Sequence, residues 1–122
     1  MEIIDANYIL RYLLQDLKEQ HLQAASVIEN HNVFIPGELI AEVVYVLQKV
    51  YSVPNELIKD SLLDLFDYPT ISIREPKIVR KALSIFTQKK VDYADALLIA
   101  YAETKDARVF TFDKKVNKIL NQ

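Results

Sequence analysis

The sequence predicts an α/β fold with a central parallel sheet of four to five strands flanked by helices. Short β-rich runs are separated by segments whose apolar residues recur at helical spacing. Strands that alternate with helices favour parallel pairing, because each helix returns the chain to the same end of the sheet. At 122 residues, the chain is expected to form a single domain over residues 1–122.

The composition favours a compact, helix-rich globule with 51% hydrophobic residues, one glycine and no cysteine. The lack of cysteine excludes a disulfide scaffold and thiolate metal sites. With a formal net charge of −2, any contact with nucleic acid must use local basic patches. No apolar run approaches ~20 residues and no basic leader precedes one, so we expect a soluble, cytoplasmic protein without membrane contact.

Four strands are predicted from β-branched or aromatic runs that end at turn-forming or acidic residues. In chain order they are residues 3–4 before Asp5, residues 33–35 before Pro36 and Gly37, residues 70–73, and residues 108–112 before Asp113.

Helices are predicted where apolar residues recur every three to four positions. Pro54 and Pro76 fit the first turns of two of them, and Asp92 fits the N-cap of a third. In chain order the predicted helices span residues 6–14, 18–30, 38–51, 54–66, 76–87, 92–104 and 114–120.

Four acids occupy places where chemistry is expected in such a fold. Asp5 and Asp113 follow the first and last predicted strands, Glu42 interrupts an apolar helix stripe, and Asp95 lies in the first turn of its helix. In open α/β sheets the reactive groups lie beyond the carboxyl ends of the strands. We therefore expect the four carboxylates to converge on one edge of the sheet.

Each acid also has a structural explanation when it is taken singly. Asp95 could stabilise the helix N-terminus, Asp113 could cap the last helix, and Glu42 could extend to solvent. Asp92 we assign to helix capping. Asp5 is the hardest to explain structurally, because an acid that directly follows a buried strand needs a partner.

A cluster of carboxylates is unfavourable by itself, since neighbouring negative charges raise one another's pKa. Without a histidine or cysteine companion, all-oxygen ligation suits Mg²⁺ or Mn²⁺. We expect Asp5, Asp95 and Asp113 to bind such an ion directly and Glu42 to bind it through water. A metal at this position can activate water and stabilise the charge on a phosphodiester.

Residues next to the acids are predicted to support them. Asn7 and Thr111, each two positions from an acid, are expected to hold a carboxylate or a metal-bound water. The candidates for contact with substrate phosphates are Lys114, Lys115 and Arg11.

Four sequence motifs in order carry a family resemblance. Residues 4–13, with Asp5, form an acidic opening motif, and residues 36–47 carry Glu42 on a helix. Residues 92–97 contain Asp95, and residues 111–113 end in Asp113. Together they resemble the PIN-domain family, and specifically the VapC-type toxins of bacterial and archaeal toxin–antitoxin pairs.

The resemblance covers nearly the whole chain and predicts a PIN-like three-layer fold. At Ala6 the family more often has threonine, so this chain lacks one hydroxyl beside the metal site. The resemblance implies a Mg²⁺-dependent endoribonuclease that is a homodimer. It also implies the toxin of a type II pair, inhibited by a cognate antitoxin whose tail enters the acidic groove.

Other functions remain open at this point. A nuclease of the same fold could act in RNA processing or on structured DNA. A phosphoryl-receiver domain has a similar length, but residues 71–74 supply no phosphoacceptor aspartate at the end of a middle strand. A binding protein whose acids only cap helices would show neither nuclease activity nor tight metal binding.

Overall fold

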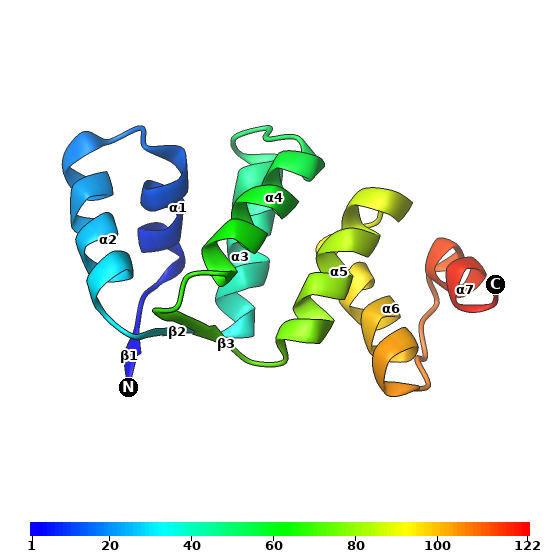
Figure 1. Cartoon of the computed structure of the whole chain (residues 1–122). Coiled ribbons are helices and arrows are strands. Elements are labelled where there is room, and N and C mark those ends of the chain that lie inside the picture. Colours follow the sequence, from blue (N-terminus) through cyan, green and yellow to red (C-terminus); the bar gives the residue numbers. More distant parts are fainter. The chain divides into compact units, whose positions relative to one another are not determined.

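The computed structural model describes every residue from Met1 to Gln122. The chain divides into two compact units, Met1–Arg74 and Glu75–Gln122. The first unit contains a small sheet with four helices, and the second contains three helices (Figure 1).

Three parallel strands form the sheet of the first unit. They are β1 (Glu2–Ile3), β2 (Val33–Ile35) and β3 (Ile71–Ile73), in the order β1-β2-β3. Ile3 lies opposite Phe34, which in turn lies opposite Ser72. Val33 and Ile35, whose side chains point to the same face of the sheet, are almost fully buried, and Phe34 on the opposite face is partly buried. The predicted α/β class and parallel pairing are therefore confirmed.

Four helices complete the first unit: α1 (Ala6–Leu14), α2 (Lys18–Asn30), α3 (Gly37–Lys49) and α4 (Asn55–Phe66). α1 packs against both α2 and α3, and α3 also packs against α4. Their apolar stripes form a core in which the largest fully buried side chains include Ile9, Ile28, Ile40, Ile58, Leu62 and Leu65. The packing of α1 against α2 and α3 holds the helix that Asp5 caps in a fixed position within the first unit.

The second unit is built on the pair α5 (Pro76–Lys89) and α6 (Tyr93–Lys105), followed by the short helix α7 (Lys114–Leu120). Phe86 of α5 meets Tyr93 of α6 edge to face, with ring centroids 6.3 Å apart. Val116 anchors α7 by a fully buried side chain. None of the helices in the chain has both the length and the apolar character needed to span a membrane.

The predicted fourth strand at residues 108–112 is wrong. This segment pairs with no other strand, and Phe110 and Phe112 are exposed by 80% and 104% of their reference areas. β-branched and aromatic residues indicate a strand only where a neighbouring strand supplies hydrogen-bond partners. Here the Arg108 guanidinium instead covers the Phe110 ring at 4.9 Å. The sheet therefore has three strands, not four to five.

Arg11 was predicted to contact phosphate, but the structure gives it other partners. Its side chain is 9% exposed on α1. Its Nη1 donates to Asp16 Oδ2 and its Nη2 to the Tyr51 hydroxyl, both at 3.0 Å. Charge-assisted bonds of this kind tie α1 to the segments that follow α1 and α3. Arg11 therefore has a structural role in the first unit.

Replacing Arg11 with alanine is expected to lower the free energy of unfolding by about 2 kcal/mol, because two charge-assisted hydrogen bonds and the packing on Tyr51 are lost. Urea unfolding of the two proteins measures this change. Arg74→Ala, which removes an exposed guanidinium from the same unit, is the control and should change stability by less than about 0.5 kcal/mol. Equal losses in both variants would show that the Arg11 network contributes nothing specific.

Candidate active site

Asp5 lies just beyond β1 and caps α1. Its Oδ1 accepts a 3.0 Å hydrogen bond from the Tyr8 backbone N–H, and its side chain is exposed. The following residue, Ala6, is buried and has an apolar side chain. The bond at Oδ1 fixes the rotamer and leaves Oδ2 free toward solvent. The sequence predicted that Asp5 needs a partner, and one such partner is the backbone N–H of Tyr8 in the helix that Asp5 caps.

Glu42 lies in the second turn of α3, at the exposed edge of the apolar stripe. The next two residues, Val43 and Val44, are fully buried in the core of the first unit. The backbone at Glu42 is therefore held rigidly, while its carboxylate stays in water and forms no ion pair within the chain. Asp5, the N-cap of α1, and Glu42, on α3, both belong to the first unit, in which α1 and α3 pack together.

Asp95 is half-buried in the first turn of α6. Burial raises the pKa of its carboxyl, and the nearby carboxylates of Asp113 and Asp92 raise it further. No cationic side chain offsets these effects. The structure thus brings Asp95 and Asp113 together within the second unit, as part of the predicted cluster.

Asp92 occupies the N-cap position of α6, as predicted, although its side chain makes no capping hydrogen bond. The φ and ψ angles of −61° and 153° are those of a residue that enters a helix from extended backbone. Its carboxylate contributes instead to the negative charge around Asp95.

Asp113 is held by a local network at the start of α7. Its Oδ1 accepts from the Val116 backbone N–H at 2.9 Å, so this acid does cap the last helix. Its own N–H donates to Thr111 Oγ1 at 3.1 Å, and the Asn117 amide donates to the Thr111 carbonyl at 2.9 Å. Thr111 therefore orients the backbone of Asp113. Asn117 was not predicted from the sequence, because its partner lies six residues away across a helix start.

The other predicted residues lie on the surface. Asn7 is exposed in the first turn of α1. Lys114 is exposed directly after Asp113. Lys115 Nζ donates to the Lys90 carbonyl at 3.1 Å, which holds its charge near the start of α6.

The donor set of the candidate site fits a hard divalent cation. All four acids offer carboxylate oxygens, which are the ligands that Mg²⁺ and Mn²⁺ prefer. Within each unit taken alone, no three acidic or histidine side chains already form a metal-binding group. The close negative charges of Asp95 and Asp113 are nevertheless the kind of pair that a bound cation stabilises.

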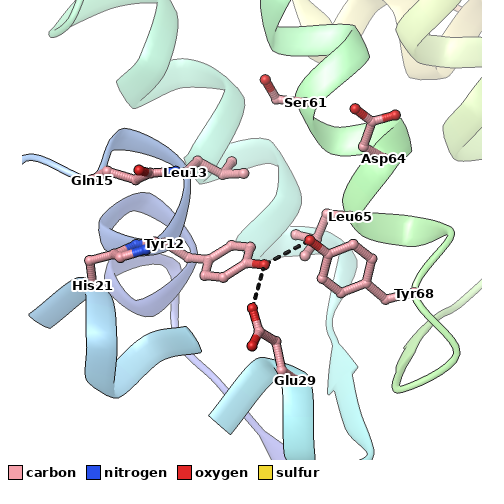
Figure 2. Close-up of a pocket in the computed structure, with 9 residues that line it drawn as sticks. All are labelled: Tyr12, Leu13, Gln15, His21, Glu29, Ser61, Asp64, Leu65 and Tyr68. Carbon is pink, nitrogen blue, oxygen red and sulfur yellow. Dashed lines mark hydrogen bonds between the residues drawn. The ribbon is translucent and has the colours of Figure 1, made fainter. Parts of the chain in front are cut away.

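A separate cavity of about 400 Å³ in the first unit contains none of the predicted acids. Figure 2 shows the Tyr12 hydroxyl pointing toward Tyr68 and Glu29. The two hydroxyls lie 2.7 Å apart, Tyr12 donates to Glu29 Oε2 at 3.1 Å, and His21 stacks on the Tyr12 ring. Burial, followed by the bond to Tyr68, raises the pKa of Tyr12. This network joins α1, α2 and the end of α4, and it is structural.

Comparison with known proteins identifies the family. No curated protein has significant sequence similarity to the chain. The family model for the PIN domain matches residues 3–120, which include all four candidate acids. PIN domains are nucleases that typically depend on divalent metals. With nearly its whole length matched, this chain belongs to the PIN-domain family.

Proposed function

We propose that this protein is a Mg²⁺- or Mn²⁺-dependent endoribonuclease whose active site combines Asp5, Glu42, Asp95 and Asp113. The observation that carries the proposal is the half-buried Asp95 carboxyl, whose pKa is raised by burial and by Asp113 in a chain of a nuclease family. The repulsion between the carboxylates of Asp95 and Asp113 lowers the stability of the folded protein. Carboxyl groups with pKa values perturbed in this way are concentrated at functional sites. Asp5, which follows β1 and caps α1, is the third proposed ligand.

The capping bonds prepare two of the carboxylates for metal binding. The Tyr8 and Val116 amides each hold one oxygen of Asp5 and Asp113, respectively, and leave the other oxygen available. Asp95 supplies the third carboxylate from the rigid first turn of α6. A bound Mg²⁺ or Mn²⁺ supplies an activated water and neutralises charge on the phosphodiester.

Glu42 is proposed to orient the attacking water, because its carboxylate is exposed on a rigid helix and free to accept the proton of that water. The water oxygen forms the new bond to phosphorus, and the bond from phosphorus to the leaving oxygen breaks. The leaving oxygen takes up a proton from solvent. Lys114, with Lys115 beside it, is proposed to contact a neighbouring phosphate.

The toxin role is a finer part of the proposal. A toxin of a type II pair would cleave cellular RNA, act as a homodimer, and be inhibited by a cognate antitoxin that reaches the acidic site. The net charge of −2 suits this arrangement, because a basic segment of such a partner would complement the acids. A PIN nuclease of RNA processing would have the same site without growth arrest.

The function is tested by incubating the purified protein with a labelled single-stranded RNA. We expect cleavage that stops completely in excess chelator and returns with added Mg²⁺ or Mn²⁺, because the proposed mechanism needs the bound ion to activate the water and to neutralise charge on the phosphodiester. Electrophoresis of the labelled products measures it, and Ca²⁺ at equal concentration is the metal control. DNA of the same sequence should remain intact. Cleavage that persists in chelator, or that is equal on DNA, would contradict the proposal.

A further inference from the structure

A cleft of about 220 Å³ is lined by residues of α1 and α2. Its walls are Asn7, Tyr8 and Arg11 from α1 and Gln20 and Gln23 from α2. Asn7 and Tyr8 belong to the first turn of α1, the turn that Asp5 caps. Part of the cleft wall therefore belongs to the helix turn that directly follows a proposed metal ligand.

The lining groups are suited to recognising a base. The side-chain amides of Asn7, Gln20 and Gln23 make no hydrogen bond within the chain, and each offers one acceptor and two donors. Gln20 and Gln23 are three residues apart and so lie on the same face of α2. Carboxamides pair with the edges of bases through two hydrogen bonds at once. No carboxylate lines this cleft, in contrast to the Tyr12 cavity with Glu29 and Asp64.

Tyr8 adds a surface on which a base would stack. The Tyr8 ring is 38% exposed and has no aromatic partner in the chain. Exposed tyrosine rings are the usual stacking surfaces for single-stranded bases.

We propose that this cleft takes one base of the single-stranded RNA, next to the phosphodiester that is cut, and that Gln20, Gln23 and Tyr8 determine the base preference. The inference rests on the proposed endoribonuclease function. The cleft volume is below the ~300 Å³ at which pockets for drug-sized ligands begin, so it suits a single ring system. A helix rises 1.5 Å per residue, so Asn7 to Arg11 lie within about 9 Å of Asp5 along α1, within reach of a base beside the bound phosphate.

The test compares cleavage sites of the wild-type protein with those of the double variant Gln20→Ala/Gln23→Ala. An RNA library with random sequence is cut, and the new ends are sequenced. We expect the wild type to prefer one base at a fixed position beside the cut and the double variant to lose about tenfold of that preference, as for one bidentate base contact. Gln88→Ala, which removes an exposed glutamine from the second unit, is the control and should keep the preference.

Tyr8 is tested by a pair of substitutions. Tyr8→Phe retains the stacking surface and should keep the KM of the wild type, whereas Tyr8→Leu should raise KM about tenfold with a smaller change in kcat. To measure RNA affinity without cleavage, each Tyr8 substitution is combined with Asp5→Asn, and binding of a labelled oligonucleotide is followed by fluorescence anisotropy. Tyr8→Leu should weaken this binding and Tyr8→Phe should not.

The outcomes separate this inference from the proposed function. If the wild type cleaves RNA and Gln20→Ala/Gln23→Ala keeps the same base preference, the cleft assignment is overturned while the nuclease function stands. A wild type that cuts without any base preference beside the cut also overturns it. If the wild type does not cleave RNA at all, both proposals fail together.

Discussion

Asp5→Asn is expected to reduce RNA cleavage by at least about 100-fold and to leave the fold intact. Loss of groups that only orient metal ligands already costs 10–100-fold in other metalloenzymes, so loss of a ligand charge should cost at least as much. The asparagine Oδ1 can still accept the bond from the Tyr8 amide, because asparagine caps helices as well as aspartate does. Stability should therefore change by less than about 1 kcal/mol, mainly from the lost charge at the start of α1.

Two companion variants make this result specific. Asp5→Ala removes the cap as well as the charge, and should lose about 1 kcal/mol of stability in addition to the activity. Asp60→Asn neutralises an exposed acid on α4 and should retain full activity. For each of the three variants, activity is measured as the initial rate of cleavage of labelled RNA, and stability is measured by thermal unfolding. If Asp5→Asn cleaves as fast as the parent, Asp5 is only a helix cap and the site assignment is wrong.

The same variant separates the toxin role from an RNA-processing role. Expression of the wild type in a bacterium is expected to stop growth, and expression of Asp5→Asn at equal protein level should not. Arrest by both proteins would mean that cleavage is not its cause. Normal growth with the active wild type would favour a processing nuclease.

Much of the local structure could be predicted from the sequence, because helix periodicity and caps are local signals. The bounds predicted for α1, α2 and α7 match those of the structure, and the N-cap position of Asp92 is confirmed. Strand prediction failed at residues 108–112, since strand formation depends on a partner that the sequence of the segment does not specify. The cap bonds of Asp5 and Asp113 follow from the same local chemistry.

Contacts between distant elements could not be read from the sequence. Spacing places Gln20 and Gln23 on one face of α2, but only the structure shows that they and Arg11 line the same cleft. The bond from Arg11 to Tyr51 was missed for the same reason, because Tyr51 is forty residues away. The approach of Asp95 to Asp113 was predicted, whereas the joining of these acids with Asp5 and Glu42 in one site stays a prediction.

Asp95→Asn is expected to abolish cleavage, to remove the stabilisation by metal, and to change the pH dependence of stability. In the parent, Mg²⁺ at ten times its dissociation constant should stabilise the folded state by about 1.4 kcal/mol. For a domain of this size that corresponds to a rise of about 3–8 °C in Tm. The variant, which lacks one carboxylate of the proposed site, should show little of this rise. Differential scanning calorimetry measures both proteins with and without the ion.

The pH dependence follows from the raised pKa of Asp95 in the folded protein. Between the unfolded and the folded pKa, the folded state binds more protons, so the contribution of Asp95 to stability falls as pH rises through this interval and is lowest above it. The free energy of unfolding of the parent relative to Asp95→Asn should therefore increase as pH is lowered from 7 toward 4 without metal. Asp106→Asn, an exposed position at the end of α6, is the matched control and should show no such trend. A trend of opposite sign would mean that the helix N-terminus stabilises the Asp95 charge more than burial and Asp113 oppose it, and Asp95 would then be a helix-stabilising residue instead of a strained metal ligand.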